Sequence, residues 1–349
     1  MDARNVVFIT SYSFYGGVGT HLLNFVSAFN GKSKVYNLVF DNKKSSRRFL
    51  GEKIFGFRPP FSSGWQLNTR LQGLAFHNFY KKLSITLTDD VILHYFDEET
   101  TPVLLREPKI ATIHDIIPLK AEFKSLYNAP SFLKKNLEKF KNFSNLVTVS
   151  NHVKNDLHEY GFEGKVEVVY PVASEHFFKL NNKMELRKLW GLPLDKKIIL
   201  SVAGFAPNKN NDVIRQTALS FGDEYILIRI GIDMGFGVYL KDVPPDRINE
   251  IYNLSDVLLF PSLDEGFGIP MLEAMSCGLP VVAADTEISR EVCEDAAVFV
   301  EPTTNGCING IKEAIADGEN LSVRGLNRAK YFAFDKFKKR VNDLYASVL

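Results

Sequence analysis

The chain has 349 residues, 45% of them hydrophobic and 24% charged, which is the composition of a folded globular protein and excludes a disordered or fibrous one. A chain of this length exceeds one ordinary hydrophobic core and predicts two domains. The net charge of +1 conceals an asymmetry: residues 1–180 carry 23 basic and 17 acidic residues (+6), which leaves 19 and 24 (−5) for residues 181–349. A basic half can face an anionic partner or arise from ordinary scatter, and both interpretations stay open.

The first half alternates short apolar runs with helical patterns. Val6–Thr10 is predicted to be a strand rather than part of a secretion signal, because its apolar stretch runs directly into a polar turn. Apolar residues then recur at helical spacing from Val18 to Phe29. Further strands are expected at Lys109–Ile113, Leu146–Val149 and Val166–Tyr170.

The same alternation restarts after the polar segment Phe178–Lys183, which is the expected link between the domains. Strands alternating with helices form parallel sheets covered on both faces, so we expect two doubly wound α/β domains, residues 1–180 and 181–332. The closing segment, residues 333–349, is an amphipathic helix expected to pack back on the first domain. The second series of predicted strands is Lys197–Ala203, Tyr225–Ile230, Val238–Leu240, Val257–Phe260, Pro280–Ala284 and Ala297–Val300.

Two segments of the first half, Trp65–Leu83 and Pro130–Phe143, combine an apolar face with basic residues. Such helices either lie on anionic membranes or pack their apolar face on a sheet, so peripheral membrane contact is one of two open alternatives. No apolar run reaches the ~20 residues that a membrane-spanning helix needs. The three cysteines lack the spacing of metal ligands and indicate a reducing, cytoplasmic setting.

The most informative turn follows the fourth strand of the second series, at the sheet edge where parallel sheets bind ligands. Glu265 lies in the loop, and Glu273 lies in the first turn of a helix that Pro270 is expected to begin. Gly266 and Gly268 let the backbone approach a ligand closely, and the positive end of the helix dipole favours anions. The turn therefore supplies two carboxylates for hydroxyl groups and a cradle for a diphosphate.

The segment Glu265-Gly-Phe-Gly-Ile-Pro-Met-Leu-Glu273 resembles the E-x7-E signature of the retaining glycosyltransferases of family 4. These enzymes have the GT-B fold, in which two Rossmann-like domains face a central cleft. The resemblance implies transfer of a hexose from a nucleotide-sugar donor, with attack on the front face and the leaving phosphate accepting the acceptor's proton. It continues at Gly16-Gly17-Val-Gly19, His114-Asp115, Val149-Ser150 and Glu291-Val292.

The resemblance also implies roles for individual residues. Glu265 would bind hydroxyls of the donor sugar beside the anomeric carbon, and His114 would contact that sugar near the reacting bond. Glu273 would bind the ribose diol. The resemblance implies further donor-binding positions in the glycine-rich turns. They would act as backbone amides, as part of the helix start or as the wall of the cleft, and they are Gly16, Gly17, Gly266, Phe267, Gly268 and Ile269.

The expected phosphate grip departs from the family pattern. The family has Gly-Arg followed by a lysine, whereas this chain has Gly204-Phe205 followed by Lys209. A leaving diphosphate needs fixed positive charge in a low-dielectric site, which Lys209 and the helix start provide in part. Arg229, at the end of another predicted strand, either replaces the missing arginine or is a structural side chain, and both interpretations remain open.

Several chemistries lack their basic parts in this sequence. It has neither the Gly-x-Gly-x-x-Gly of dinucleotide binding nor a Walker loop, and no nucleic-acid module. It also lacks the Asp-x-Asp that would hold a divalent metal, so we expect metal-independent transfer without a cofactor. The expected partners are a UDP-, GDP- or ADP-hexose, whose base would contact Gly231–Asp242, and a glycan, lipid-linked or small-molecule acceptor. The alternatives are a nucleotide-sugar epimerase and a sugar-nucleotide-binding subunit without activity.

Overall fold

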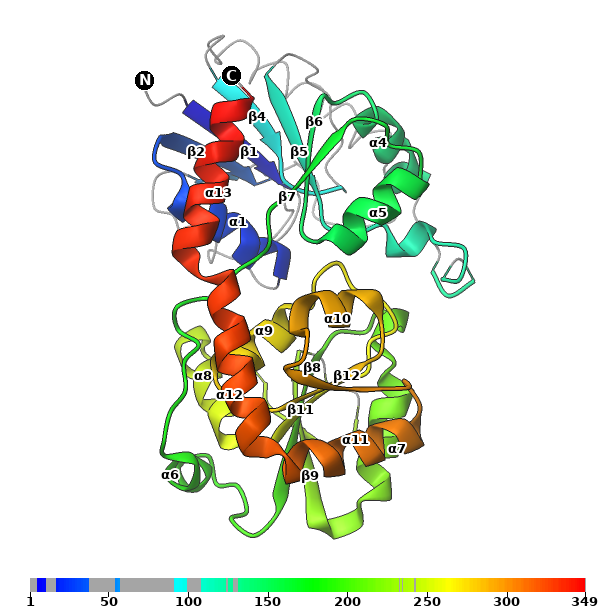
Figure 1. The fold of residues 1–349 in the computed structure, drawn as a ribbon, viewed down its shortest axis with the longest axis vertical. Helices are drawn as coiled ribbons and strands as arrows, with labels where there is room; N and C mark the ends of the chain where they lie inside the picture. Colours follow the sequence, from blue (N-terminus) through cyan, green and yellow to red (C-terminus); the bar gives the residue numbers. More distant parts are fainter. Residues whose placement is uncertain are drawn as a thin grey trace.

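The computed structural model describes residues 5–10, 17–37, 54–56, 91–98, 108–123, 125–127, 131–231, 233, 235–241 and 243–348. Gly16, the segment Trp65–Leu83 and parts of Gly231–Asp242 lie outside these residues. Figure 1 shows two lobes, each built around one sheet with helices packed against it.

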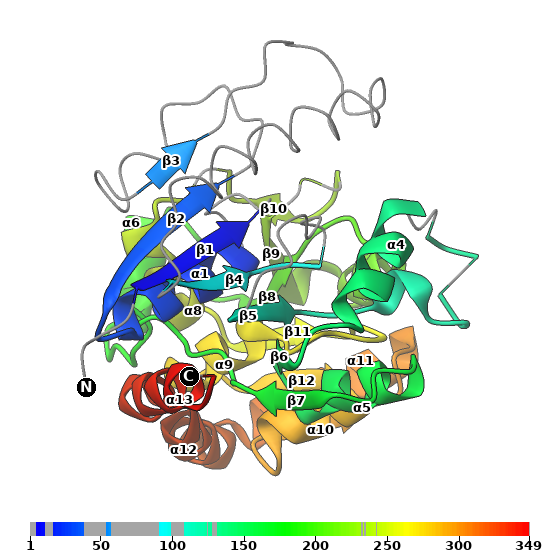
Figure 2. The ribbon, with the colours of Figure 1, turned by 90° about the horizontal axis from the view of Figure 1, so that it is seen from above.

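The first domain contains a parallel sheet of seven strands in the order β3-β2-β1-β4-β5-β6-β7, which Figure 2 shows from above. In β1, Val7 and Ile9 join one buried cluster, while Val6 and Phe8 join another on the opposite face. This alternation is expected of a strand whose sheet is covered on both sides. The strands are β1 Asn5–Thr10, β2 Lys32–Asn37, β3 Ile54–Gly56, β4 Val91–Tyr95, β5 Lys109–Ile113, β6 Asn145–Thr148 and β7 Lys165–Val168, and the described α-helices of this part of the chain are α1 Gly17–Ala28, α4 Ser131–Phe140 and α5 Asn151–Glu159. The next helix, α6 Lys183–Leu189, packs on the second domain.

The second domain contains a parallel sheet of six strands in the order β10-β9-β8-β11-β12-β13. The prediction of two doubly wound, Rossmann-like domains is confirmed by these two sheets. Its strands are β8 Lys197–Ala203, β9 Tyr225–Gly231, β10 Val238–Tyr239, β11 Val257–Phe260, β12 Val281–Ala284 and β13 Ala297–Val300. Its helices are α7 Asn211–Ser220, α8 Ile248–Leu254, α9 Ile269–Ser276, α10 Glu287–Cys293, α11 Thr304–Ala316 and α12 Gly318–Ala329.

The last helix, α13 (Phe334–Ser347), returns to the first domain and packs against α1. Figure 1 shows α12 beside the lower lobe and α13 beside the upper one, in a single column along the same side. Phe337, Val341 and Leu344 are buried in the cluster that also contains Phe8 and Phe25. The first domain therefore shares its core with residues that follow the second domain in the chain.

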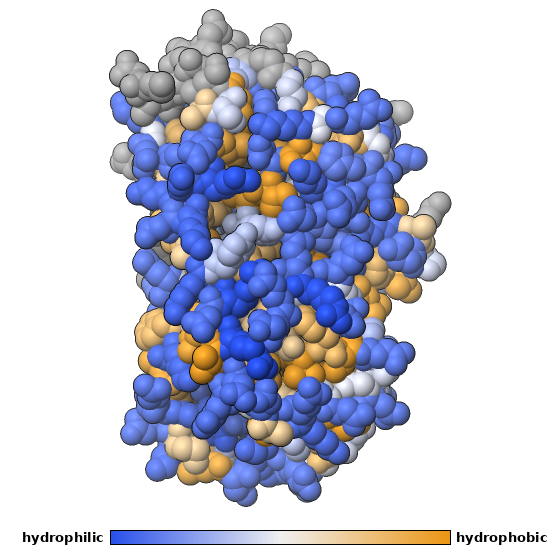
Figure 3. All heavy atoms as spheres, viewed as in Figure 1, coloured by the Kyte–Doolittle hydropathy of each residue, from blue (hydrophilic) through white to orange (hydrophobic). Residues whose placement is uncertain are grey.

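The apolar face of α4 is occupied by the protein core. Leu133, Leu137 and Phe140 are buried, whereas Lys134 and Lys135 are exposed. The sequence left open whether this apolar face contacts a membrane or packs on the sheet, and the structure shows it packed inside the protein. Figure 3 shows hydrophilic residues over most of the face in view, with apolar ones in smaller areas of both lobes. Within the described part of the chain, no helix is long and apolar enough to cross a bilayer.

We predict that Phe337→Ala lowers the free energy of unfolding by about 3–5 kcal/mol, because a buried aromatic ring is lost from a packed core. The Phe337 ring lies edge-on to Phe25, with 5.2 Å between ring centroids. Phe334→Ala on the same helix is the control, since Phe334 is 38% exposed. Chemical denaturation would contradict the packing of α13 if both variants lost the same stability.

Candidate functional site

The loop between β11 and α9 is built around Gly268. Its φ of 91° lies in the left-handed region, and an added Cβ would come within 2.4 Å of Met271 Cε. Both constraints favour glycine there. α9 begins at Ile269, with Pro270 in its first turn, so the predicted helix start lies one residue later than the observed one. The loop therefore ends with amide groups at the start of a helix, an arrangement that suits an anion.

Lys209 and Glu265 form an ion pair at the carboxyl ends of β8 and β11. Lys209 Nζ lies 2.6 Å from Oε1 and 2.7 Å from Oε2 of Glu265. The two side chains are 23% and 11% exposed. Parallel strands end at the same sheet edge, which explains why residues 56 positions apart in the chain meet here. The sequence singled out both residues, and the structure brings them together.

Glu273 lies apart from this pair, just after the first turn of α9, because the helix begins one residue earlier than the sequence predicted. It is half-buried, and Tyr252 in α8 donates its hydroxyl to Oε2 of Glu273 at 2.5 Å. Burial raises the pKa of Glu273 to about 7, while the bond from Tyr252 opposes the rise. Tyr252 is fully buried, and its role was not predicted from the sequence.

The first domain contributes His114 and Asp115, which follow β5. His114 is 8% exposed. Its Nε2 lies 3.2 Å from Nδ1 of His21, and its Nδ1 lies 3.5 Å from a carboxylate oxygen of Glu98. The backbone N–H of His114 donates to the same Glu98 oxygen at 3.0 Å. The imidazole is therefore fixed between a second imidazole and a carboxylate.

Asp115 faces the charges of both domains. Burial raises its pKa to about 7, the negative charges of Glu98 and Glu265 add to the rise, and Lys209 opposes it. Neither Glu98 nor His21 was predicted from the sequence. Glu98 follows the run VILHYF, which signals a strand that the sequence analysis did not identify.

The two domains touch at the glycines of the predicted site. A Cβ on Gly266 would lie 2.2 Å from the carbonyl oxygen of His114, so this glycine permits the close approach of the two backbones. A Cβ on Gly17, at the start of α1, would lie 3.4 Å from Ile269 Cδ1. Phe267 is buried and its ring packs edge-on against Phe332, so its side chain belongs to the protein core.

Arg229 lies inside β9 and is fully buried. Its guanidinium donates to Ser201 Oγ at 3.3 Å and to Asn211 Oδ1 at 3.0 Å, and it lies over the Phe236 ring. Asn211 in turn donates to the carbonyl of Gly204, at the start of the turn that carries Lys209. Among the described contacts, Arg229 therefore reaches this turn through Asn211. Phe205, at the family's arginine position, is 64% exposed.

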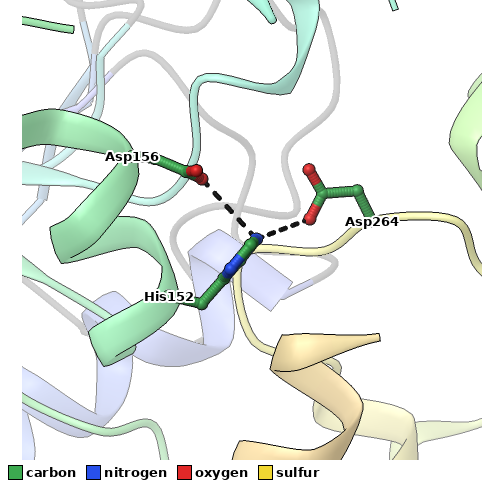
Figure 4. A group of neighbouring side chains, drawn as sticks. All are labelled: His152, Asp156 and Asp264. Atoms are coloured by element: carbon green, nitrogen blue, oxygen red, sulfur yellow. Dashed lines mark hydrogen bonds and ion pairs between the residues drawn. The ribbon is translucent and has the colours of Figure 1, made fainter. Parts of the chain in front are cut away.

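One group of side chains has the composition of a metal site. Nitrogen and oxygen atoms of His152, Asp156 and Asp264 lie within 4.8 Å of one another, as Figure 4 shows. Lys120 Nζ lies 2.6 Å from a carboxylate oxygen of each aspartate. An ammonium group thus supplies positive charge between the two carboxylates.

Comparison with known proteins identifies the family of both domains. The family model "Glycosyltransferase Family 4" matches residues 15–173, and "Glycosyl transferases group 1" matches residues 238–330. The chain is 26% identical over 267 residues to the O-antigen chain mannosyltransferase RfbU of Salmonella typhimurium, covering 70% of each chain. It is 33% identical over 123 residues to O-antigen chain mannosyltransferase B of Escherichia coli, covering 34% of this chain and 32% of that one.

The fold of this chain is similar to that of the Anabaena protein HepE, solved in complex with UDP and glucose. The TM-score is 0.78 at 16% identity, over 99% of this chain and 100% of the other. The two family models together span most of both domains. With its two Rossmann-like domains and the segment Glu265–Glu273 at their meeting edge, the chain belongs to the family 4 glycosyltransferases.

Proposed function

We propose that the protein transfers a hexose from a nucleoside-diphosphate sugar to an acceptor hydroxyl with retention of configuration and without a metal ion. The observation that carries the proposal is the Lys209–Glu265 pair beside the start of α9. In the reaction, the bond between C1 of the hexose and the diphosphate oxygen breaks. The bond from C1 to the acceptor oxygen forms on the same face, and the hydroxyl proton passes to the departing phosphate.

Lys209 and the amides at the start of α9 supply the positive charge that the departing diphosphate needs. A fixed cation in a site closed to water stabilises such charge far more than an exposed one does. Glu265 accepts hydrogen bonds from the hexose hydroxyls, and its two bonds from Lys209 fix the direction of the carboxylate. His114, fixed by His21 and Glu98, forms the wall of the first domain beside the sugar.

Glu273 accepts the ribose hydroxyls, and Arg229 acts on the diphosphate as a buried charge behind the Gly204 turn. For Arg229, the support is its chain of bonds through Asn211 to the Gly204 carbonyl. The names of the relatives, two of them O-antigen chain mannosyltransferases, favour a growing glycan as acceptor. The complex of HepE with UDP makes UDP a natural first nucleotide to test, beside GDP and ADP.

The proposal is tested by incubating the purified protein with UDP-, GDP- and ADP-hexoses, with and without glycan and lipid-linked acceptors. We expect acceptor-dependent release of one nucleoside diphosphate, unchanged in excess EDTA, with the anomeric configuration retained in the product. Acceptor-independent interconversion of donor sugars would identify an epimerase instead. Binding without turnover would identify a sugar-nucleotide-binding subunit, and activity lost in EDTA but restored by Mg²⁺ or Mn²⁺ would refute metal independence.

Gly266→Ala is expected to lower the rate of transfer about 10- to 100-fold, because the added Cβ forces the two backbones apart at the reacting centre. The affinity for the nucleoside diphosphate should change little, since that ligand is held by the second domain. Gly318→Ala is the matched control, because its Cβ would meet an atom only at 3.8 Å. Equal rates for both variants would show that the contact of Gly266 with His114 is irrelevant to transfer.

Donor affinity is expected to fall as the pH drops from about 8 to about 6, because protonation of Glu273 removes an acceptor for the ribose hydroxyls. The raised pKa of about 7 places this titration near neutrality. Tyr252→Phe removes the bond that stabilises the carboxylate, so the midpoint should move to higher pH. Glu273→Gln should reduce the pH dependence of the affinity, leaving the part that Asp115 contributes, and weaken binding at pH 8 by about 1.5–3 kcal/mol. Calorimetry showing the same pH dependence in Glu273→Gln would remove Glu273 from the donor site.

A further inference from the structure

Asp264, the residue before Glu265, belongs to the second domain but is held by side chains of the first. Its Oδ2 accepts a bond from Lys120 Nζ at 2.6 Å, and its Oδ1 lies 2.8 Å from Nε2 of His152. Figure 4 shows His152 and Asp156 on one helix, with Asp264 reaching them from a loop of the other domain. The side chains of Lys120, His152 and Asp264 are only 7–13% exposed.

The same carboxylate fixes the backbone of Glu265. Asp264 Oδ1 accepts the backbone N–H of Glu265 at 2.8 Å. On the other side, the carbonyl of Gly266 accepts a bond from Ser150 Oγ of the first domain at 2.7 Å. The backbone is therefore held at the N–H of Glu265 and again at the carbonyl of the next residue, Gly266, by atoms that the first domain supplies or holds in place.

Charge complementarity makes this cluster sensitive to the loss of any member. Burial lowers the pKa of His152, but its bond to Asp264 and the charge of Asp156 outweigh burial and raise the pKa overall. Burial raises the pKa of Asp264, but bonds from His152 and Lys120 outweigh it and lower the pKa overall. Removing Lys120, His152 or Asp264 would leave an opposite charge unpaired at a site with little access to water.

A second contact fixes the helix that carries His152. The carboxylate of Glu291 in α10 accepts the backbone N–H groups of Asn151 and His152, at 2.6 and 2.9 Å, at the start of α5. The hydroxyl of Tyr170 donates to the same carboxylate at 2.8 Å. The first turn of α5 is thereby attached to the second domain beside the bond from His152 to Asp264.

We propose that Lys120 and His152 are positioning residues, which set the place of Glu265 through Asp264 when the two domains are in contact. The inference rests on the role proposed for Glu265 in transfer. It implies that Glu265 reaches its working position only while the first domain holds Asp264. Nucleotide binding by the second domain alone does not require this contact.

The test compares Lys120→Met, His152→Gln and Asp264→Asn with Glu287→Gln in the full chain. Glu287 Oε2 also lies near His152, at 3.3 Å from Nδ1, but its side chain is 81% exposed, so this variant is the matched control. We expect kcat to fall about 10- to 100-fold in the first three variants, because a small misplacement of a reacting group has such effects. The Kd for UDP, GDP or ADP, whichever binds wild type, should stay within about twofold.

Two measurements separate positioning from general damage. Lys120→Arg keeps the charge and should recover most of kcat, and the double variant Lys120→Met, Asp264→Asn should lose no more than its worse single variant. Unchanged kcat in Lys120→Met and Asp264→Asn, or losses of kcat that only follow losses of thermal stability, would overturn the inference. If wild type transfers no hexose from any donor, the proposed function itself fails. If wild type is active and every variant has the same kcat as Glu287→Gln, the positioning role is refuted while the proposed function stands.

Discussion

At the meeting edge of the two sheets, one ammonium group, Lys209 Nζ, interacts with the carboxylates of both domains. It donates hydrogen bonds to both carboxylate oxygens of Glu265. Burial and the negative charge of Glu98 raise the pKa of Asp115, and the positive charge of Lys209 opposes that rise. Like charges placed near one another repel, and Lys209 offsets part of this repulsion. In the proposed reaction a diphosphate adds more negative charge, which the amides at the start of α9 are placed to stabilise.

Two buried histidines of the first domain, His21 and His94, favour the uncharged form. Burial, followed by the charge of His114, lowers the pKa of His21 and takes that of His94 to about 3. His94 lies 2.6 Å from the Tyr345 hydroxyl and 2.7 Å from Thr112 Oγ1. A neutral imidazole can donate one bond and accept one, and the two bonds of His94 fix its ring without adding charge. The Tyr345 contact also links α13 to β4, and through His94 to Thr112 in β5.

The sequence predicted those parts that local pattern determines. The strands Val257–Phe260 and Ala297–Val300 have the predicted bounds, because each is a short apolar run with a clear end signal, Pro261 after the first and Glu301 after the second. β4 was missed, and with it Glu98, since its run was not recognised as a strand. Arg229 lies near the carboxyl end of β9, as predicted, but the sequence did not show that its side chain is buried.

Partners far apart in the chain were beyond local reasoning. His152 and Asp264 are 112 residues apart and meet only because two separate domains pack together. No periodicity carries that information. The hydrogen bond from the Tyr252 hydroxyl to Glu273 joins α8 to α9, which are separated in the chain by β11. It depends on the direction of the two side chains rather than on their spacing in the sequence. The motif therefore identified the residues of the site, while their charge states came from neighbours that only the fold reveals.

The path of α13 has a consequence for the order in which the protein is made. A ribosome completes the first sheet early, but the residues that cover it next to α1 follow the entire second domain. At roughly 5–20 residues per second, the first domain waits on the order of ten seconds or more with part of its apolar surface open to water. During that interval it offers a surface to chaperones and to other nascent chains. Emergence of the last helix, rather than completion of either sheet, is then the event that ends this exposure.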